Sequence, residues 1–412
     1  MRRDPQEVKA ALATLDRQHL RRIRRTVERY SESGNRTGVI VDGRPLIDFC
    51  GNDYLGLAHH PKLAEAMTAA AVREGTGSGA AHLITGHGLE HARLEESLAI
   101  YTGRERVLLF STGYMANLAV ITALAGRGER VLLDRLSHAS LIDATRLSGA
   151  SFKRYPHNDA GAAAAALQNH ADVATVVATD GVFSMDGDLA PLPALATACR
   201  AHAAWLVVDD AHGLGVLGPT GRGTLEHFGL NSDDVPLLVG TLGKAFGCFG
   251  AFAAGDADLI ELLMQKSRSY IYTTALPQPV AAAARMALEL ADRESWRRER
   301  VLALTTRFRR GTAELGLSLM DSQTPIQPLL IGSAEAALQA HEKLFAAGFW
   351  VAAIRPPTVP ADTARLRITL SAAHTDAQVD ALIEALGEIR PSISPVSTQG
   401  PLPDLSLCGR KG

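Results

Sequence analysis

Short apolar runs rich in β-branched residues alternate with segments of helical composition through the middle of this chain, from about residue 52 to residue 274. The runs that read as strands are 106–110, 130–134, 152–156, 174–179, 205–210, 237–241 and 249–255. Between them lie segments such as 162–170, which begins with five consecutive alanines and so favours a helix. Strands separated by helices form βαβ units, so the pattern predicts an α/β fold with a mostly parallel sheet covered by helices.

Polar residues stand where several of these strands end. They are Ser111, Thr112, Gly113, Asp134, Asp180, Asp209, His212 and Thr241. In open α/β sheets, ligands bind in the crevice outside the carboxyl ends of the strands. The sequence therefore predicts a ligand site along this edge of the sheet.

The segments that flank the alternating region differ from it. Residues 6–29 combine partial apolar periodicity with many arginines, which predicts a basic helix, and Asp42-Gly43 predicts a hairpin turn. An amphipathic segment, 277–315, leads into a smaller α+β region, and the Pro-, Ser- and Gly-rich end is predicted to be disordered. The predicted parts are an N-terminal helix and hairpin segment (1–51), a large domain (52–285), a small C-terminal domain (286–390) and a tail (391–412).

Charge and cysteine usage narrow the class of protein. Forty-two Lys and Arg face 44 Asp and Glu, a formal net charge of −2, which favours neither nucleic acid nor an anionic membrane as a partner. No apolar run reaches the roughly 18 residues that span a bilayer, and no secretory h-region follows the N-terminus. Cys50, Cys199, Cys248 and Cys408 form no CxxC pair and predict reduced thiols. We expect a cytoplasmic protein.

Two strand ends carry the most specific chemistry, in the segments WLVVDDAHGLG (205–215) and VGTLGKAFG (239–247). Asp209 closes a buried strand, where a carboxylate is costly unless it meets a positive charge or donors, such as a protonated pyridine nitrogen. Taken alone, Asp209 is equally compatible with a structural or helix-capping role. Lys244, in an apolar, glycine-rich setting, is the candidate nucleophile and covalent anchor for an aldehyde cofactor.

Other residues fit the same cofactor. His212 follows Asp209 closely enough to approach one ligand from another side. Thr241 and the 111–113 segment, just before a helix expected near Tyr114, offer hydroxyls and amides to a phosphate, and the His138 ring can stack on the cofactor.

Two further motif matches are discounted. His87 to His91 fits the H-x-x-E-H zinc pattern, but Gly86 and Gly88 weaken a helix there and no third ligand stands out, so we expect no metal. Gly213 to Gly218 resembles a dinucleotide fingerprint, but the Pro219 that follows breaks the helix that such a site needs. A nicotinamide dehydrogenase is thus a weak alternative, and a non-catalytic binding protein would be expected to have lost the lysine or the aspartate.

The chain resembles the α-oxoamine synthases, enzymes that depend on pyridoxal 5'-phosphate (PLP) and join an amino acid to an acyl thioester with loss of CO2. The resemblance runs from about residue 20 to residue 390. It is carried by the segments 49–61 (FCGNDYLGLAHHP), 109–117, 134–144 (DRLSHASLIDA), 180–192, 207–218, 240–247 (GTLGKAFG), 270–278 and 354–375. It implies the PLP-dependent transferase fold type I, acting as a homodimer with its sites at the interface.

The resemblance also implies roles for single residues. Lys244 would anchor the cofactor, Asp209 would pair with its pyridine nitrogen, and His212 would bind its phenolic oxygen. His138 would stack on the ring and act in catalysis. The remaining cofactor contacts would be Gly113, Tyr114, Ser184 and Thr241. The substrate contacts would be Asn52, His138, Thr358, Arg367 and one of Arg21 and Arg22. Thr273 and Thr274 would reach the phosphate of the partner subunit.

Two departures from the family pattern accompany these matches: Asp180 stands where many relatives have Glu, and residues 80–88 differ from the usual loop. Within the family, these sequence motifs most resemble those of members that condense L-alanine with a pimeloyl thioester in biotin biosynthesis. Glycine C-acetyltransferase and 5-aminolevulinate synthase are the alternatives. Whether coenzyme A or an acyl-carrier protein carries the acyl group is left open.

Overall fold

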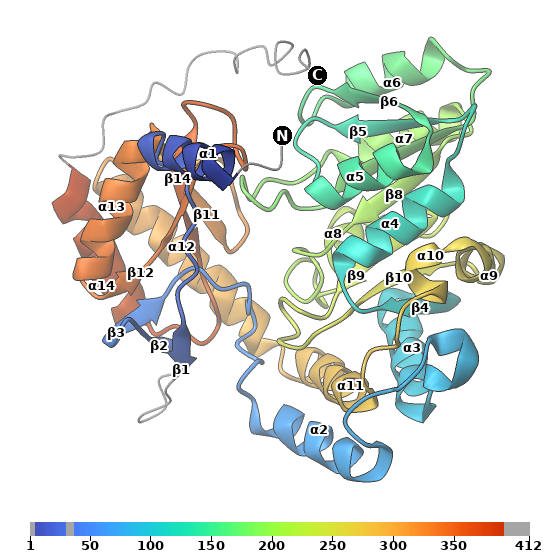
Figure 1. The fold of residues 1–412 in the computed structure, drawn as a ribbon, viewed down its shortest axis with the longest axis horizontal. Helices are drawn as coiled ribbons and strands as arrows, with labels where there is room; N and C mark the ends of the chain where they lie inside the picture. Colours follow the sequence, from blue (N-terminus) through green and yellow to red (C-terminus); the bar gives the residue numbers. More distant parts are fainter. Residues whose placement is uncertain (1–4, 30–36, 391–412) are drawn as a thin grey trace.

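A seven-stranded sheet forms the centre of the chain, whose computed structural model describes residues 5–29 and 37–390 (Figure 1). Its strand order is β4-β10-β9-β8-β7-β5-β6, and β5 to β9 run parallel. The strands are β4 (Arg106–Phe110), β5 (Arg130–Asp134), β6 (Ser151–Tyr155), β7 (Thr175–Asp180), β8 (Trp205–Asp209), β9 (Leu237–Thr241) and β10 (Ala251–Gly255). The mostly parallel α/β sheet predicted from the sequence is thus confirmed, with β10 antiparallel to both of its neighbours.

Helices cover both faces of this sheet. Along β5, Leu132 enters one apolar cluster whereas Val131 and Leu133 enter the other, as the alternation of side chains along a strand requires. The second cluster is covered by α4 (Gly113–Leu124), α5 (Ala139–Ser148), α9 (Ala257–Lys266) and α10 (Arg268–Ile271). The first is covered by α3 (Leu89–Thr102), α6 (Ala160–Gln168), α7 (Leu192–Ala201) and α8 (Thr224–Phe228).

The amphipathic segment expected over 277–315 is two helices rather than one. Helix α11 (Gln278–Arg293) packs on α2 (Pro61–Glu74) and α3, and α12 (Trp296–Glu314) continues toward the C-terminal part. The break falls at Glu294 and Ser295, the second of which precedes the first turn of α12. The Ser295 hydroxyl makes no capping bond to the backbone of α12 and donates to Glu299 Oε1 at 3.2 Å.

A smaller α+β unit is built from both ends of the chain. Its antiparallel sheet has the order β11-β14-β13, and a second sheet has the order β1-β2-β3-β12. Their strands are β1 (Val27–Arg29), β2 (Gly38–Val41), β3 (Arg44–Asp48), β11 (Ile326–Gly332), β12 (Phe349–Trp350), β13 (Ala352–Ile354) and β14 (Ala364–Thr369). Helix α13 (Ala334–Ala346) packs on β11 to β14, and α14 (Asp376–Ile389) packs on α12 and α13. Because β3 pairs in parallel with β12, residues 38–48 belong structurally with the C-terminal part.

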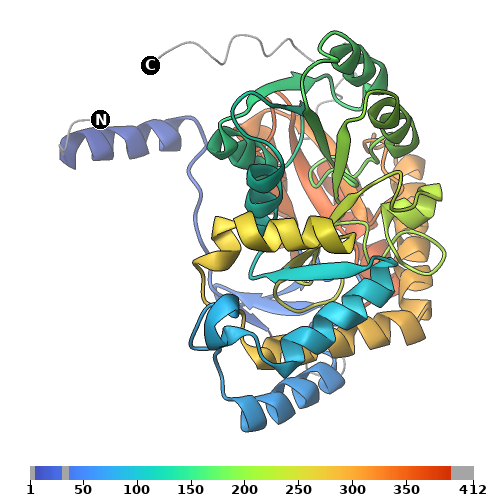
Figure 2. The ribbon, with the colours of Figure 1, turned by 90° about the vertical axis from the view of Figure 1, so that its right-hand side faces the viewer.

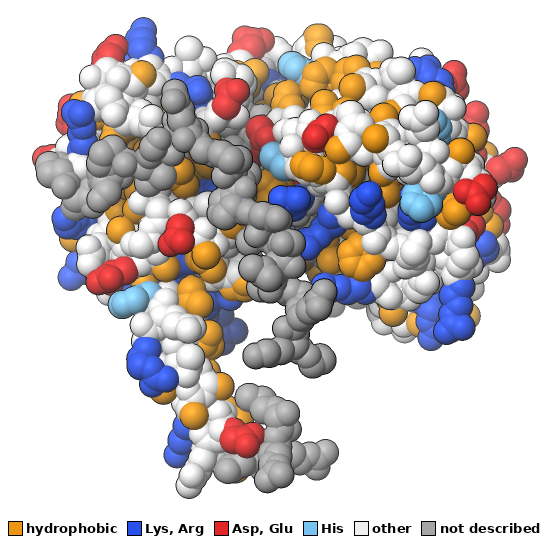
Figure 3. Space-filling model, turned by 90° about the horizontal axis from the view of Figure 1, so that it is seen from above, with side chains coloured by type: hydrophobic (Ala, Val, Ile, Leu, Met, Phe, Trp, Pro, Cys, Tyr) orange, Lys and Arg blue, Asp and Glu red, His pale blue; other side chains and the backbone are white. Residues whose placement is uncertain are grey.

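The predicted hairpin is confirmed, whereas the predicted length of the N-terminal helix is wrong. Asp42 and Gly43, which join β2 to β3, both have positive φ, as a tight type I′ turn requires. Helix α1 (Pro5–Arg17) ends well before residue 29 and buries no residue. Figures 2 and 3 show it standing away from the rest of the chain. The arginine-rich stretch that follows is extended, and there Arg25 pairs with Asp42 at 2.7 Å.

Within residues 5–29 and 37–390, no helix is long and apolar enough to cross a membrane. The predicted disordered tail, 391–412, lies outside the described residues.

Candidate active site

A chain of hydrogen bonds at the carboxyl end of the large sheet connects Lys244 to Arg367. Lys244 Nζ lies 2.8 Å from His212 Nε2, and the other ring nitrogen of His212 lies 2.7 Å from the hydroxyl of Tyr54. That hydroxyl donates to Asn52 Oδ1 at 3.2 Å, and Arg367 donates to the same oxygen at 3.1 Å. The structure thereby brings together two of the predicted cofactor residues, Lys244 and His212, and two of the predicted substrate residues, Asn52 and Arg367.

The setting of Lys244 favours its uncharged form. Burial lowers the pKa of the Lys244 ammonium from 10.5 to about 8, with Asp209 and Asp180 opposing that change and Arg367 adding to it. Burial and the nearby positive charges of Lys244 and Arg367 also lower the pKa of His212, which is therefore neutral at pH 7. A lysine that loses its proton near physiological pH is an effective nucleophile and base.

Asp209 lies at the end of β8, as expected from the apolar run before it, and only 7% of it is exposed. The parallel register places it beside Asp180, the last residue of β7. Asn117 Nδ2, from α4, donates to Asp209 Oδ2 at 2.6 Å, and the Ala211 amide donates to Oδ1 at 3.1 Å. These donors stabilise the ionised carboxylate at a site with little access to water.

His138 begins α5 next to these carboxylates. Its backbone amide donates to Asp180 Oδ2 at 2.9 Å, and its Nδ1 lies 2.7 Å from Ser140 Oγ. Burial and the proximity of Asp209 raise the pKa of Asp180 well above its usual value. His138 is exposed in the isolated chain.

Backbone and hydroxyl groups at a helix start can hold a phosphate. Thr112 caps α4 by accepting from the Met115 amide at 3.2 Å, and a side chain added at Gly113 would meet no atom within 4 Å. Thr241, at the end of β9, accepts from the Gly243 amide at 3.2 Å. Tyr114 is partly exposed and donates to Asp143. The free amides and positive dipole end of α4 suit an anionic group in the open space above Gly113.

The predicted substrate residues divide into two groups. Besides bonding Asn52, Arg367 donates from Nε to the Ser184 carbonyl at 2.6 Å, which places the predicted Ser184 beside it. Arg22 donates to the Thr358 hydroxyl at 3.0 Å. Arg21 instead pairs with Asp16 of α1 at 2.8 Å. Of the two N-terminal arginines proposed from the sequence, the structure therefore brings Arg22 to another predicted substrate residue.

A cavity of about 330 Å³ opens beside Lys244. Its wall includes Asn52, Arg29 from the N-terminal segment, and Ser371 and His374 from the C-terminal part. It lies where the two ends of the chain meet the large sheet, a usual location for a small-molecule site.

Three residues of this site were not predicted to act there, although each lies in a segment that carries the family resemblance (49–61, 109–117 and 134–144). Tyr54, Asn117 and Ser140 are buried, and each bonds a predicted site residue: Tyr54 bonds His212, Asn117 bonds Asp209, and Ser140 bonds His138. Asn117 and Tyr54 act over separations of 92 and 158 residues. Only the fold brings these pairs together.

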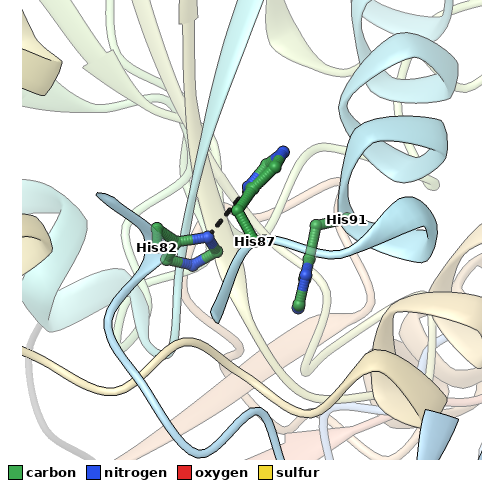
Figure 4. A group of neighbouring side chains, drawn as sticks. All are labelled: His82, His87 and His91. Carbon is green, nitrogen blue, oxygen red and sulfur yellow. Dashed lines mark hydrogen bonds between the residues drawn. The ribbon is translucent and has the colours of Figure 1, made fainter. Parts of the chain in front are cut away.

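The discounted zinc pattern is part of a histidine cluster (Figure 4). A third imidazole, His82, lies beside the pair, with its Nδ1 3.0 Å from His87 Nδ1. However, His91 accepts from the Gly88 amide through Nδ1 and donates to the Leu276 carbonyl through Nε2, at 2.9 and 2.6 Å. Both ring nitrogens of His91 are therefore used in hydrogen bonds within the protein, and His82 is a third neighbouring imidazole that the sequence did not indicate.

The chain is similar to proteins of one known family. A family model described as aminotransferase class I and II matches residues 44–386. The 8-amino-7-oxononanoate synthase of Pseudomonas paraeruginosa is 60% identical over 357 residues, 87% of this chain and 89% of the relative. That of Methylococcus capsulatus is 58% identical over 382 residues, 93% of this chain and 98% of the relative. The chain belongs to the 8-amino-7-oxononanoate synthases.

Solved structures agree with this family. Serine palmitoyltransferase from S. paucimobilis, with a bound PLP–myriocin aldimine, has a TM-score of 0.88 at 29% identity and covers 94% of this chain and 98% of its own. The 8-amino-7-oxononanoate synthase of Francisella tularensis has a TM-score of 0.73 at 31% identity, over 84% and 98%. The enzyme is thus a PLP-dependent acyltransferase of fold type I, as the sequence predicted. The residues present fit PLP, because Lys244 supplies a buried amine, Asp209 a buried carboxylate, and the start of α4 an open space at Gly113.

Proposed function

We propose that this 8-amino-7-oxononanoate synthase condenses L-alanine with a pimeloyl thioester, releasing CO2 and the free thiol carrier, and so supplies 8-amino-7-oxononanoate for biotin. The observation that carries the proposal is the position of Lys244. Its readily deprotonated amine lies in one hydrogen-bonded group with Arg367 and Asn52, which suit an amino-acid carboxylate, and beside the buried carboxylate Asp209.

PLP, when bound, supplies an electron sink for the carbanion that forms at the amino acid's Cα. Lys244 would anchor it, Asp209 would keep its ring nitrogen protonated, and His212 would bind its phenolic oxygen. Thr241 would bind its phosphate, Gly113 and Tyr114 would lie along the cofactor, and Ser184 would lie near it. Thr273 and Thr274 would reach the partner subunit's phosphate.

Each of the other site residues then acts on substrate. Arg367, whose planar fork matches a carboxylate, and Asn52 orient the amino acid. Lys244 Nζ takes the proton from Cα, and His138 polarises the acyl carbonyl. Arg22 and Thr358 hold the acyl chain, the thioester or its carrier. Coenzyme A and an acyl-carrier protein are both compatible with this arrangement.

We infer a homodimer with its sites at the interface. Helix α1 contacts nothing in its own chain closely enough to bury a residue, although Val8, Leu12 and Leu15 give it apolar positions. Leu83, Ile84 and Tyr272, near Thr273 and Thr274, are also exposed. A second copy is the occupant that covers such apolar positions.

The test is incubation of the PLP-loaded enzyme with labelled L-alanine and pimeloyl-CoA or pimeloyl-carrier protein, followed by mass spectrometry of the product. We expect 8-amino-7-oxononanoate, little product with glycine, and none from Lys244→Ala. Lys266→Ala, which removes an exposed lysine on α9, is the matched control and retains activity. Equal turnover of glycine with acetyl- or succinyl-CoA would overturn the assignment in favour of another α-oxoamine synthase.

A further inference from the structure

A buried line of hydrogen bonds runs from Asp209 to the ring of His138. Asn117 Nδ2 lies 2.6 Å from Asp209 Oδ2 and 2.8 Å from Ser140 Oγ, and Ser140 Oγ lies 2.7 Å from His138 Nδ1. Asn117 is 1% exposed and Ser140 is fully buried. Water therefore does not compete for the two bonds of Asn117, whereas the bond between Ser140 and the His138 ring is partly buried.

The direction of the line is set at Asp209. An ionised carboxylate only accepts, so the amide nitrogen of Asn117 must face it, and the second N–H of that nitrogen is directed at Ser140 Oγ. The opposite orientation of the amide would put Oδ1 against the carboxylate. Asn117 Oδ1 is buried without a hydrogen-bond partner, a cost that the fold accepts in order to direct both N–H groups along the line.

The direction continues to the imidazole. Ser140 Oγ accepts from Asn117, so its own hydrogen is available for His138 Nδ1. The Ser140 backbone amide, which can only donate, also points at Nδ1, at 3.3 Å. Two donors therefore converge on Nδ1, and in the neutral ring the proton must be on Nε2. Burial and the positive charge of Lys244 lower the pKa of His138, against the opposing effect of Asp209, so the neutral ring prevails at pH 7.

We propose that Asn117 and Ser140 are positioning residues that hold His138 as the Nε2–H tautomer, so that His138 donates a hydrogen bond to the acyl carbonyl oxygen of the thioester. The inference rests on the proposed function. As the Cα–C bond forms, the carbonyl electron pair moves onto this oxygen, and Nε2–H stabilises the developing negative charge. When the carbonyl re-forms, the C–S bond breaks and the thiolate leaves with the electron pair. The opposite tautomer would present a lone pair to that oxygen and repel it.

The same line couples the role of His138 to the charge of Asp209. If Asp209 were protonated, its hydroxyl could donate, and Asn117 would no longer be held in one orientation. The ionised form of Asp209, which PLP also needs, therefore fixes the donor that acts on the second substrate.

The direct test is the tautomer in the holoenzyme. Enzyme containing ¹⁵N-histidine is loaded with PLP, and its ring nitrogens are observed by long-range ¹H–¹⁵N NMR, with His138→Gln identifying the His138 signals. We expect a protonated Nε2 and an unprotonated Nδ1 at pH 7. A proton on Nδ1 in the active enzyme would overturn the proposal.

Kinetics test the role. Ser140→Ala removes one of the two donors to Nδ1, so we expect kcat to fall about 10-fold, while the dissociation constant of L-alanine, measured from the cofactor absorbance, stays within about 2-fold. Ser148→Ala is the matched control, since its hydroxyl, on the same helix, bonds the Thr145 carbonyl; it should change neither. An unchanged kcat in Ser140→Ala would refute the positioning role. A wild-type enzyme that shows Nε2–H but forms no product would instead refute the proposed function.

Discussion

Replacing Lys244 with methionine should make the cofactor-free protein more stable at neutral pH, although it abolishes the reaction. The pKa of Lys244 is about 8 in the folded chain and 10.5 when it is free of its surroundings. At 1.36 kcal/mol per pKa unit, carrying the charged lysine at pH 7 costs the folded state about 3 kcal/mol. The variant also loses the hydrogen bond from Nζ to His212, which is worth about 1 kcal/mol. The expected net gain for Lys244→Met is about 2 kcal/mol.

The pH dependence distinguishes this cause from better packing of methionine. Between pH 8 and 10.5 the unfolded chain binds a proton on Lys244 that the folded chain does not bind, so wild-type stability rises with pH relative to the variant. By pH 10 the advantage of Lys244→Met should have fallen to about zero. Equilibrium urea unfolding of both cofactor-free proteins at pH 7 and pH 10 measures it, with Lys266→Met as the exposed control. A variant no more stable than wild type at pH 7, or an advantage independent of pH, would refute the reasoning.

Three other outcomes are expected. Arg367→Lys should raise the KM for L-alanine about 10-fold or more without loss of bound PLP, because an ammonium cannot match a carboxylate with two parallel bonds; steady-state kinetics and cofactor absorbance decide this. Gly247→Ala should cost about 3 kcal/mol in urea unfolding, since the new Cβ would lie 2.3 Å from the Ala58 nitrogen, whereas Gly103→Ala, at the same φ of 64° but in open space, should cost about 1 kcal/mol. Burial lowers the pKa of His157, but its hydrogen bonds to Asp134 and Asp188 raise it to about 10, so His157→Gln should destabilise most below about pH 6.5 and progressively less as pH rises through 10; a pH-independent loss would contradict this.

The strand ends of the large sheet could be predicted because two local signals coincide there. An apolar β-branched run identifies the strand, and the polar residue that follows it identifies the ligand edge, as for Asp209 and Thr241. Parallel strands then bring these residues to one side of the sheet without further information. Lys244 and His212 each follow one of these strands closely, so their position at the ligand edge could be predicted in the same way.

What could not be predicted depends on contacts across the chain. Asn117 lies in an apolar helix and has no partner nearby in sequence, so nothing marks it as the donor to Asp209.

The length predicted for the N-terminal helix is too great for a related reason. A helix of this length gains stability mainly from burying an apolar face, and α1 buries none, so the arginines beyond Arg17 bind separate partners instead, Arg22 reaching Thr358.

The parallel pairing of β3 with β12 determines when the enzyme can be completed during synthesis. Phe349 and Trp350 pair with Ile47 and Asp48, about 300 residues earlier in the chain. The ribosome makes the first strand long before the second, so residues 38–48 have no partner in β12 until more than four-fifths of the chain exists. The central sheet, whose strands are all made before residue 256, can form in the meantime. Asn52 can join Arg367, from β14, only after this delay, so the carboxylate-binding pair is assembled among the last parts of the nascent chain.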